Sequence, residues 1–233
     1  MEGLILMNNL DILYEDNHII VVIKPVDILS QSDITKDIDM LTLVKQYVKK
    51  KYHKPGNVYI GLVHRLDRPV SGVMVFARTS KAASRLSEDI KKHNFKKTYL
   101  AVVHGRVEKK CTLTDYLCKE ENGNTIISNS KNGKYAELSF ECLNYDHVLD
   151  VSLVKIILKT GRHHQIRVQF ASRNHPLLGD KRYGIDDRFD NIGLFAYKLE
   201  FTHPVTKEKL IFSALPTDID GFKNFDVSNF VKE

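Results

Sequence analysis

One acidic side chain stands between two arginines in the segment His64-Arg65-Leu66-Asp67-Arg68. An ionised carboxylate can act as a covalent nucleophile, and a neighbouring guanidinium stabilises its charged form and orients it. Asp67 is therefore a candidate reactive group. Aspartate is also common in ordinary surface turns, so this segment taken alone leaves a purely structural role for Asp67 open.

Apolar runs flank this segment and predict the elements that hold it. Residues 58–63 and 72–77 are rich in β-forming residues and predict two strands, with Pro69 and Gly72 marking the turn between them. Basic and aromatic residues elsewhere in the chain could join the carboxylate: Arg65, Arg162, Arg167 and Tyr99. Taken singly, each of these also has an ordinary structural role, such as a surface cation of a helix or a half-buried strand residue.

Hairpins outnumber strand–helix–strand units along the chain, which predicts an α+β protein with a mainly antiparallel sheet. Helical spacing of apolar residues predicts helices over 40–52, from Thr79 or Ser80 to about 93, and from about 163 to 174. Polar residues dominate 117–134 and predict an exposed hairpin or loop insertion. Further strands are expected over these ranges: 11–24 as a hairpin, 98–103, 136–142, 151–158, and 194–213 as a closing hairpin.

The balance of charges suggests a polyanionic partner. The 233 residues include 35 lysines and arginines against 29 acids, a net charge of +6. The densest basic stretch runs from Lys91 to Lys97 around Phe95, and Lys45–Lys51 forms a second cluster. Such lysines could follow an RNA backbone, but they also suit a helix C-terminus or a solvated face.

Several classes of chemistry lack their motifs. There is no phosphate-binding GxxxxGK[ST] or GxGxxG loop, no HExxH, and no GxSxG elbow. His163 and His164 are adjacent, so on a helix their rings should diverge and share no metal ion. The three cysteines form no CxxC pair, and no secretory signal or membrane-spanning run is evident. We therefore expect a cytoplasmic protein without cofactor or metal.

Several segments together resemble the RluA family of pseudouridine synthases. These are His64-Arg65-Leu66-Asp67 with Ser71-Gly72, Lys97-Thr98-Tyr99-Leu100-Ala101, Thr160-Gly161-Arg162 with His164-Gln165-Ile166-Arg167, His175-Pro176-Leu177-Leu178-Gly179-Asp180 and Tyr183-Gly184. The likeness extends to the opening, from Leu13-Tyr14-Glu15-Asp16 through Lys24-Pro25, and to the closing His203-Pro204. It covers about residues 11 to 216 and predicts one catalytic domain over 1–233, without the accessory RNA-binding domain that many relatives carry.

The resemblance implies a role for each matching residue. Asp67 would be the nucleophile, Tyr99 would lie against the target base, and Arg167 would pair with Asp67. Arg65 would fill the stack that the flipped uridine leaves. The other RNA contacts implied or suggested by position are His64, Arg162, Gln165, Lys96 and Lys97. The family fold is a curved, mixed but mostly antiparallel sheet with flanking helices and a central RNA-binding cleft.

The predicted function is conversion of specific uridines in ribosomal or transfer RNA to pseudouridine. The reaction moves the C1′ bond from N1 to C5 without redox change, which agrees with the missing cofactor motifs. Val70, His163 and Phe195 depart from residues usual in the family, and they suggest altered substrate preference. The alternatives are an RNA-binding protein or chaperone on the same fold, and a hydrolytic N-glycosidase that releases uracil. We expect a monomer.

Overall fold

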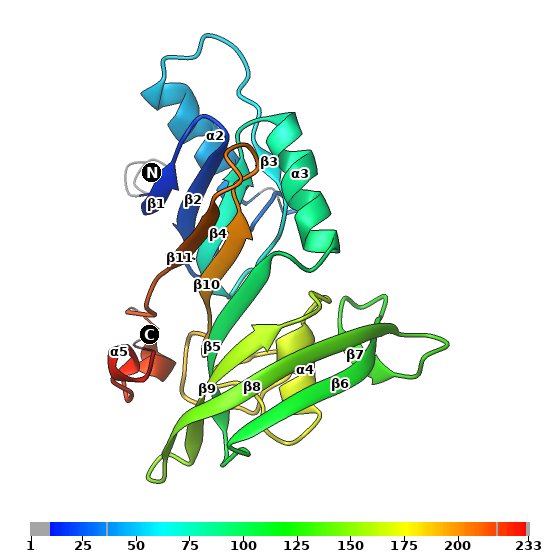
Figure 1. Cartoon of the computed structure of the whole chain (residues 1–233). Coiled ribbons are helices and arrows are strands. Elements are labelled where there is room, and N and C mark those ends of the chain that lie inside the picture. Colours follow the sequence, from blue (N-terminus) through cyan, green and yellow to red (C-terminus); the bar gives the residue numbers. More distant parts are fainter. Residues whose placement is uncertain (1–9, 36, 218, 232–233) are drawn as a thin grey trace. The chain divides into compact units, whose positions relative to one another are not determined.

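The computed structural model describes residues 10–35, 37–217 and 219–231. Contacts divide the chain into two compact units (Figure 1). The first unit extends up to Phe95 and includes Lys198–Ala214, and the second comprises Lys96–Tyr197 and the segment from Leu215 onward. In the part of the chain that is described, no helix has the length and apolar character needed to cross a membrane.

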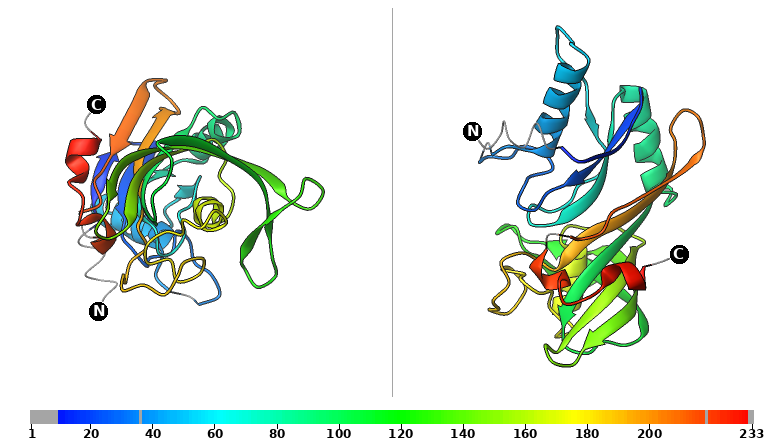
Figure 2. Two further views of the ribbon diagram at one scale, coloured as in Figure 1. Left: turned by 90° about the horizontal axis from the view of Figure 1, so that it is seen from below. Right: turned by 90° about the vertical axis from the view of Figure 1, so that its left-hand side faces the viewer.

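The first unit is an antiparallel sheet between two helices (Figure 2, right). Strand β2 pairs with β1 on one side and with β4 on the other, and the Lys198–Thr202 part of β10 pairs with β11. The elements are β1 (Ile12–Glu15), β2 (Ile19–Lys24), α2 (Met40–Lys51), β3 (Gly61–Leu62), β4 (Ser71–Ala77), α3 (Ser80–Lys91) and β11 (Lys209–Ser213). β10 (Leu194–Thr202) begins in the second unit and belongs to the first from Lys198 onward.

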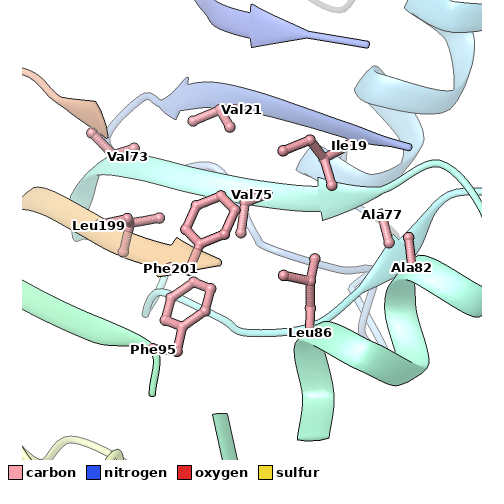
Figure 3. Close-up of a cluster of buried hydrophobic side chains, with 10 residues drawn as sticks. All are labelled: Ile19, Val21, Val73, Val75, Ala77, Ala82, Leu86, Phe95, Leu199 and Phe201. Atoms are coloured by element: carbon pink, nitrogen blue, oxygen red, sulfur yellow. The ribbon is translucent and has the colours of Figure 1, made fainter. Parts of the chain in front are cut away.

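Successive side chains of a strand point to opposite faces of the sheet. Because β2 and β4 are apolar along most of their length, both faces of this sheet are apolar. One face packs against α3, where Leu86 is fully buried and Phe95 stacks on Phe201 with ring centroids 5.1 Å apart (Figure 3). The buried residues of this cluster are Ile19, Val21, Val73, Val75, Ala77, Ala82, Leu86, Phe95, Leu199 and Phe201. β4 is buried along its whole length, so the loop that precedes it leads into a rigid strand.

The second unit is a curved antiparallel sheet that wraps around one short helix (Figure 2, left). β9 pairs with β5 and β8, and β6 pairs with β8 and β7, all antiparallel. A register shift between Cys142 and Asn144 in β8 adds to the bending of the strand. The elements are β5 (Lys96–His104), β6 (Lys110–Lys119), β7 (Thr125–Ser128), β8 (Lys134–Asp146), β9 (Val151–Leu158), α4 (Gln165–Ala171), a 3-10 turn (Asp220–Phe222) and α5 (Val227–Phe230).

The predicted elements are largely confirmed, with two corrections. Residues 58–63 were expected as one strand, but only Gly61–Leu62 pairs with β4. The helix expected from about 163 to 174 covers only Gln165–Ala171, because His164 adopts the left-handed conformation with φ of 51° and breaks the helical path. Within 117–134, β7 pairs with the end of β6, so the exposed segment contains a hairpin.

Candidate active site

Asp67 lies in the loop between β3 and β4 of the first unit, between two residues whose backbone groups are held by side chains from other segments. The Ser30 hydroxyl donates to the Leu66 carbonyl at 2.7 Å and accepts from the Leu66 amide at 3.0 Å. On the other side, the Lys24 ammonium donates to the Arg68 carbonyl at 2.9 Å. The half-buried Asp67 therefore sits on a backbone fixed immediately before and after it.

Lys24 is the buried cation of this loop. Its side chain has no exposed surface, and its Nζ also donates to the Pro25 carbonyl at 2.8 Å. Burial lowers the pKa of the Lys24 ammonium from 10.5 to about 7, while the charges of Asp27 and Asp67 act in the opposite direction. Lys24 thus anchors the loop, and in its protonated form it also places positive charge near Asp67.

The two arginines that flank Asp67 differ in their surroundings. Arg65 is exposed on the loop, as a residue that contacts RNA must be. Arg68 is also exposed, and its guanidinium pairs with Asp37 at 2.9 Å and donates to the Asp27 carbonyl. His64 is half-buried, with its Nε2 accepting from the Val75 amide at 3.1 Å, so its ring is oriented by β4.

In the second unit, β5 positions the predicted Tyr99 and two of the predicted lysines. Tyr99 is 7% exposed and faces Ile156 of β9 in the strand register. Lys96 is exposed, whereas Lys97 is half-buried and burial lowers the pKa of its ammonium. Of these two lysines, Lys96 is the one placed to meet a polyanion.

Arg167 is buried in α4 and forms a two-pronged ion pair with Asp180. Its Nε donates to Asp180 Oδ2 at 2.8 Å, and its Nη2 donates to Oδ1 at 2.6 Å. Asp180 has no role predicted from its motif, and the family resemblance implies Asp67 as the partner of Arg167. Pairing with Asp67, which belongs to the other unit, stays a prediction.

Gln165 organises the turn that precedes α4. Its Oε1 accepts from the Thr160 hydroxyl at 2.8 Å and from the Arg162 amide at 3.0 Å, and its Nε2 donates to the Glu137 carbonyl. The side chain is 3% exposed, so RNA would reach it only after the turn rearranges. The exposed Arg162 is anchored by its Nε to the Tyr135 carbonyl at 2.7 Å, and it is the better placed of the two for an RNA contact.

The two adjacent histidines do not diverge as expected. Both precede α4, and their rings stack with centroids 3.6 Å apart. His163 Nδ1 lies 2.9 Å from the Thr125 hydroxyl, and His164 Nδ1 lies 2.7 Å from the Tyr183 hydroxyl. Burial and the nearby Arg167 lower the pKa of His164 from 6.5 to about 3, so His164 is neutral around pH 7.

This histidine should make folding stability depend on pH. The unfolded chain takes up a proton at His164 near pH 6.5, whereas the folded chain does so only near pH 3, so stability falls as the pH drops between these values. From pH 7 to 5 we expect the free energy of unfolding of the wild type to fall by about 1 kcal/mol more than that of His164→Gln. Urea unfolding at both pH values measures this, with His147→Gln, at an exposed position, as control. Equal pH dependence of wild type and His164→Gln would contradict it.

Within the described ranges, no group of three or more histidine, cysteine or acidic residues is arranged to hold a metal ion. The three cysteines, Cys111, Cys118 and Cys142, are unlinked thiols.

Comparison with known proteins identifies the family. A family model described as RNA pseudouridylate synthase matches residues 18–172. The chain belongs to this family. The ribosomal large subunit pseudouridine synthase D of Vibrio vulnificus is 33% identical over 227 residues, covering 90% of this chain and 68% of that synthase. The tRNA pseudouridine synthase C of Haemophilus ducreyi is 30% identical over 228 residues, covering 88% of this chain and 90% of the relative.

The fold agrees with that of a solved structure. Human RNA Pseudouridylate Synthase Domain Containing 4 matches with a TM-score of 0.77 and 20% identity, covering 92% of each chain. The expectation of an α+β pseudouridine synthase fold is thereby confirmed. The protein is an RNA-modifying isomerase of this family, and a non-catalytic RNA chaperone is not favoured.

Proposed function

We propose that this protein isomerises specific uridines in ribosomal or transfer RNA, with Asp67 as the nucleophile. The observation that carries the assignment to Asp67 is its anchoring, by Ser30 at Leu66 and by Lys24 at Arg68. A nucleophile that must attack one carbon of a substrate gains from a backbone held in one geometry. An ordinary surface turn is not usually held by a buried lysine side chain, as this loop is held by Lys24.

The remaining roles follow the family resemblance and the chemistry. Asp67 attacks C1′ or the ring, the N1–C1′ bond breaks, and the uracil turns until its C5 faces C1′. The C5–C1′ bond then forms as the bond to Asp67 breaks and the carboxylate is released. C5 loses its proton and N1 takes up a proton, so the product is an isomer of uridine and no oxidant or reductant is consumed. Tyr99 provides an aromatic surface for the loose base, and Arg167 balances the carboxylate charge.

The target base must leave its stack before it reacts, at a cost of about a few kcal/mol. We propose that Arg65 fills the vacated space, while basic and polar residues hold the surrounding RNA and offset this cost. Arg162 and Lys96, which are exposed, contact RNA directly in this proposal, and the half-buried His64 and Lys97 lie next to Arg65 and Lys96 in the chain. Gln165 is buried and acts by holding the turn that carries Arg162. In this proposal the chain acts as one catalytic domain and as a cytoplasmic monomer, with RNA bound in a central cleft and no cofactor.

Incubation with RNA tests the proposal. Unmodified ribosomal and transfer RNA should gain pseudouridine at defined positions when mixed with the purified protein alone, as measured by nucleoside mass spectrometry. Mapping of the modified positions identifies the substrate. Binding without any new pseudouridine would support the chaperone alternative, and free uracil in the supernatant would support an N-glycosidase.

The Lys91–Lys97 stretch should account for part of the RNA affinity. Lys91 and Lys96 are exposed, whereas Lys92 pairs with Glu88 at 2.7 Å and Lys97 is half-buried. We expect Lys91→Gln with Lys96→Gln to weaken binding and to lower the slope of log affinity against log salt by about 1 for each lysine. Filter binding at several salt concentrations measures the slope, with Lys92→Gln as a control of smaller effect. A slope unchanged by the double substitution would show that the stretch does not touch RNA.

A further inference from the structure

The guanidinium of Arg167 is held on two sides by residues of its own unit. Asp180 takes its Nε–Nη2 edge through the two hydrogen bonds described above. The ring of Tyr183 lies beside it, with the guanidinium carbon 5.2 Å from the ring centroid. The Arg167 side chain is 6% exposed and that of Asp180 is fully buried, so water competes little with these contacts.

We propose that Asp180 and Tyr183 are positioning residues that fix the orientation of Arg167 for the isomerisation. The inference rests on the proposed function, because it takes Arg167 as the residue that balances the reacting carboxylate. Neither Asp180 nor Tyr183 needs to touch the RNA in this role.

Asp180 can impose an orientation because its own carboxylate is fixed. Oδ1 accepts from the backbone amides of Arg182 at 3.0 Å and Tyr183 at 3.1 Å. Burial acts to raise the pKa of Asp180, but the hydrogen bonds and charge of Arg167 outweigh it and keep this pKa below its ordinary value, so Asp180 is ionised. A two-pronged pair with a fixed carboxylate sets the plane of the guanidinium.

The same pair also decides which side of Arg167 can meet a second carboxylate. A guanidinium has one edge with Nε and one Nη, and a second edge with both Nη atoms. Asp180 occupies the first edge, so another acceptor can approach only the edge that carries Nη1. If the Arg167 side chain rotated, the N–H groups on the edge that carries Nη1 would no longer point toward the second carboxylate.

Tyr183 is likewise fixed, by contacts from two distant segments. Its hydroxyl accepts from the Thr125 amide of β7 at 2.7 Å and lies 2.7 Å from His164 Nδ1. Because the oxygen accepts from Thr125 and His164 is neutral, the Tyr183 proton is available to point at His164 Nδ1. The ring thus forms a rigid wall that limits the movement of Arg167 on one face of its guanidinium.

A double-mutant cycle between Asp180 and Arg167 tests the proposal. We expect Asp180→Asn to lower kcat at least about tenfold while the Kd for RNA changes less than about threefold. In an Arg167→Gln background the same substitution should cause no further loss, because there is no guanidinium left to position. Full additivity of the two losses, or an unchanged kcat in Asp180→Asn, would overturn the assignment.

Asp115→Asn is the matched control. Asp115 also anchors α4 through a carboxylate, since it binds Gln169 at 2.6 Å and Arg173 at 3.0 Å, but no contact joins it to the Arg167–Asp180 pair among the described hydrogen bonds. It should lower thermal stability and leave kcat within about twofold of wild type. A loss of kcat in Asp115→Asn equal to that in Asp180→Asn would show that any weakening of α4 suffices, which would overturn the specific role of Asp180.

Because a buried guanidinium without its partner can prevent folding, Tyr183 supplies a second test. Tyr183→Leu removes the ring and leaves the ion pair intact, and it should lower kcat about fivefold. Tyr183→Phe keeps the ring and should recover most of that loss. Equal losses in both variants would overturn the role of the ring.

The outcomes are separable from those of the proposed function. If Asp67→Ala is inactive while Asp180→Asn and Tyr183→Leu turn over normally, the positioning role is wrong and the proposed function stands. If Asp67→Ala turns over normally, the proposed function itself is wrong.

Discussion

Replacement of Asp67 by alanine should abolish pseudouridine formation and leave RNA binding almost unchanged. The substitution removes the proposed nucleophile, and we expect a loss of more than about 1,000-fold in rate, of the size seen when a covalent catalyst is deleted. The Kd for RNA should stay within about threefold, because RNA affinity comes from basic side chains and one half-buried carboxylate repels the polyanion only weakly. Quantified pseudouridine after a fixed time and filter binding provide the two readouts.

Asp37→Ala is the matched control for this substitution. Asp37 is an exposed carboxylate that pairs with Arg68, the residue directly after Asp67. Its removal takes away one negative charge beside the same loop and should leave the rate within about twofold, since exposed ion pairs contribute little. Turnover by Asp67→Ala at the rate of the Asp37→Ala protein would refute the nucleophile assignment.

Replacement of Lys24 by methionine should have the second largest effect on activity. Methionine keeps an unbranched apolar stem but cannot donate to the Pro25 and Arg68 carbonyls. The backbone next to Asp67 would lose its anchor, and a displacement of about 1 Å at a reacting group can cost about 100-fold in rate. We therefore expect a fall in kcat of about 100-fold with the Kd for RNA changed less than threefold.

Lys45→Met, at an exposed position of α2, controls for the loss of a lysine from the same unit. Circular dichroism melting should be recorded for both variants, and their rates should be compared at a temperature where both are folded. A kcat in Lys24→Met equal to that in Lys45→Met would show that the Arg68 carbonyl does not need its anchor for catalysis.

Locally encoded elements could be predicted from the sequence. α2 and α3 begin where Asp39 and Thr79 cap them, with side chains accepting from the Thr42 and Ala82 amides. The β1–β2 and β10–β11 hairpins follow from apolar runs around polar turns. In each case the signal lies within about a dozen residues, so a single stretch of chain is sufficient to specify the element.

Elements that depend on distant contacts could not be predicted with the same accuracy. The start of α4 is set by Gln165, whose side chain bonds to Thr160 and to the Glu137 carbonyl in β8. The stacked arrangement of His163 and His164 depends on Thr125 and Tyr183, which lie far from them in the sequence. Periodicity around 163–174 contains none of this information, and it therefore predicted a longer helix with diverging rings.

The candidate site shows the same division. Asp67, Tyr99 and Arg167 were predicted as site residues from their motifs, whereas Lys24 and Asp180 stood within motifs but received no role. Lys24 is fully buried and Asp180 nearly so. A charged residue is buried only where a partner compensates it, and the sequence alone does not show which distant residue is that partner. Asp180 and Tyr183 stand only three residues apart, directly after Gly179, but this spacing by itself assigns neither of them a role.

The most direct test of Asp67-dependent isomerisation is the release of tritium from RNA labelled at C5 of uridine. Formation of the C5–C1′ bond expels the C5 hydrogen, so tritium appears in water only when a uridine is isomerised. We predict that the wild type releases one tritium for each pseudouridine formed, with no free uracil. Asp67→Asn, which keeps the shape of the side chain but lacks its charge, should release none above background. Tritium release by Asp67→Asn at the wild-type rate would contradict this mechanism.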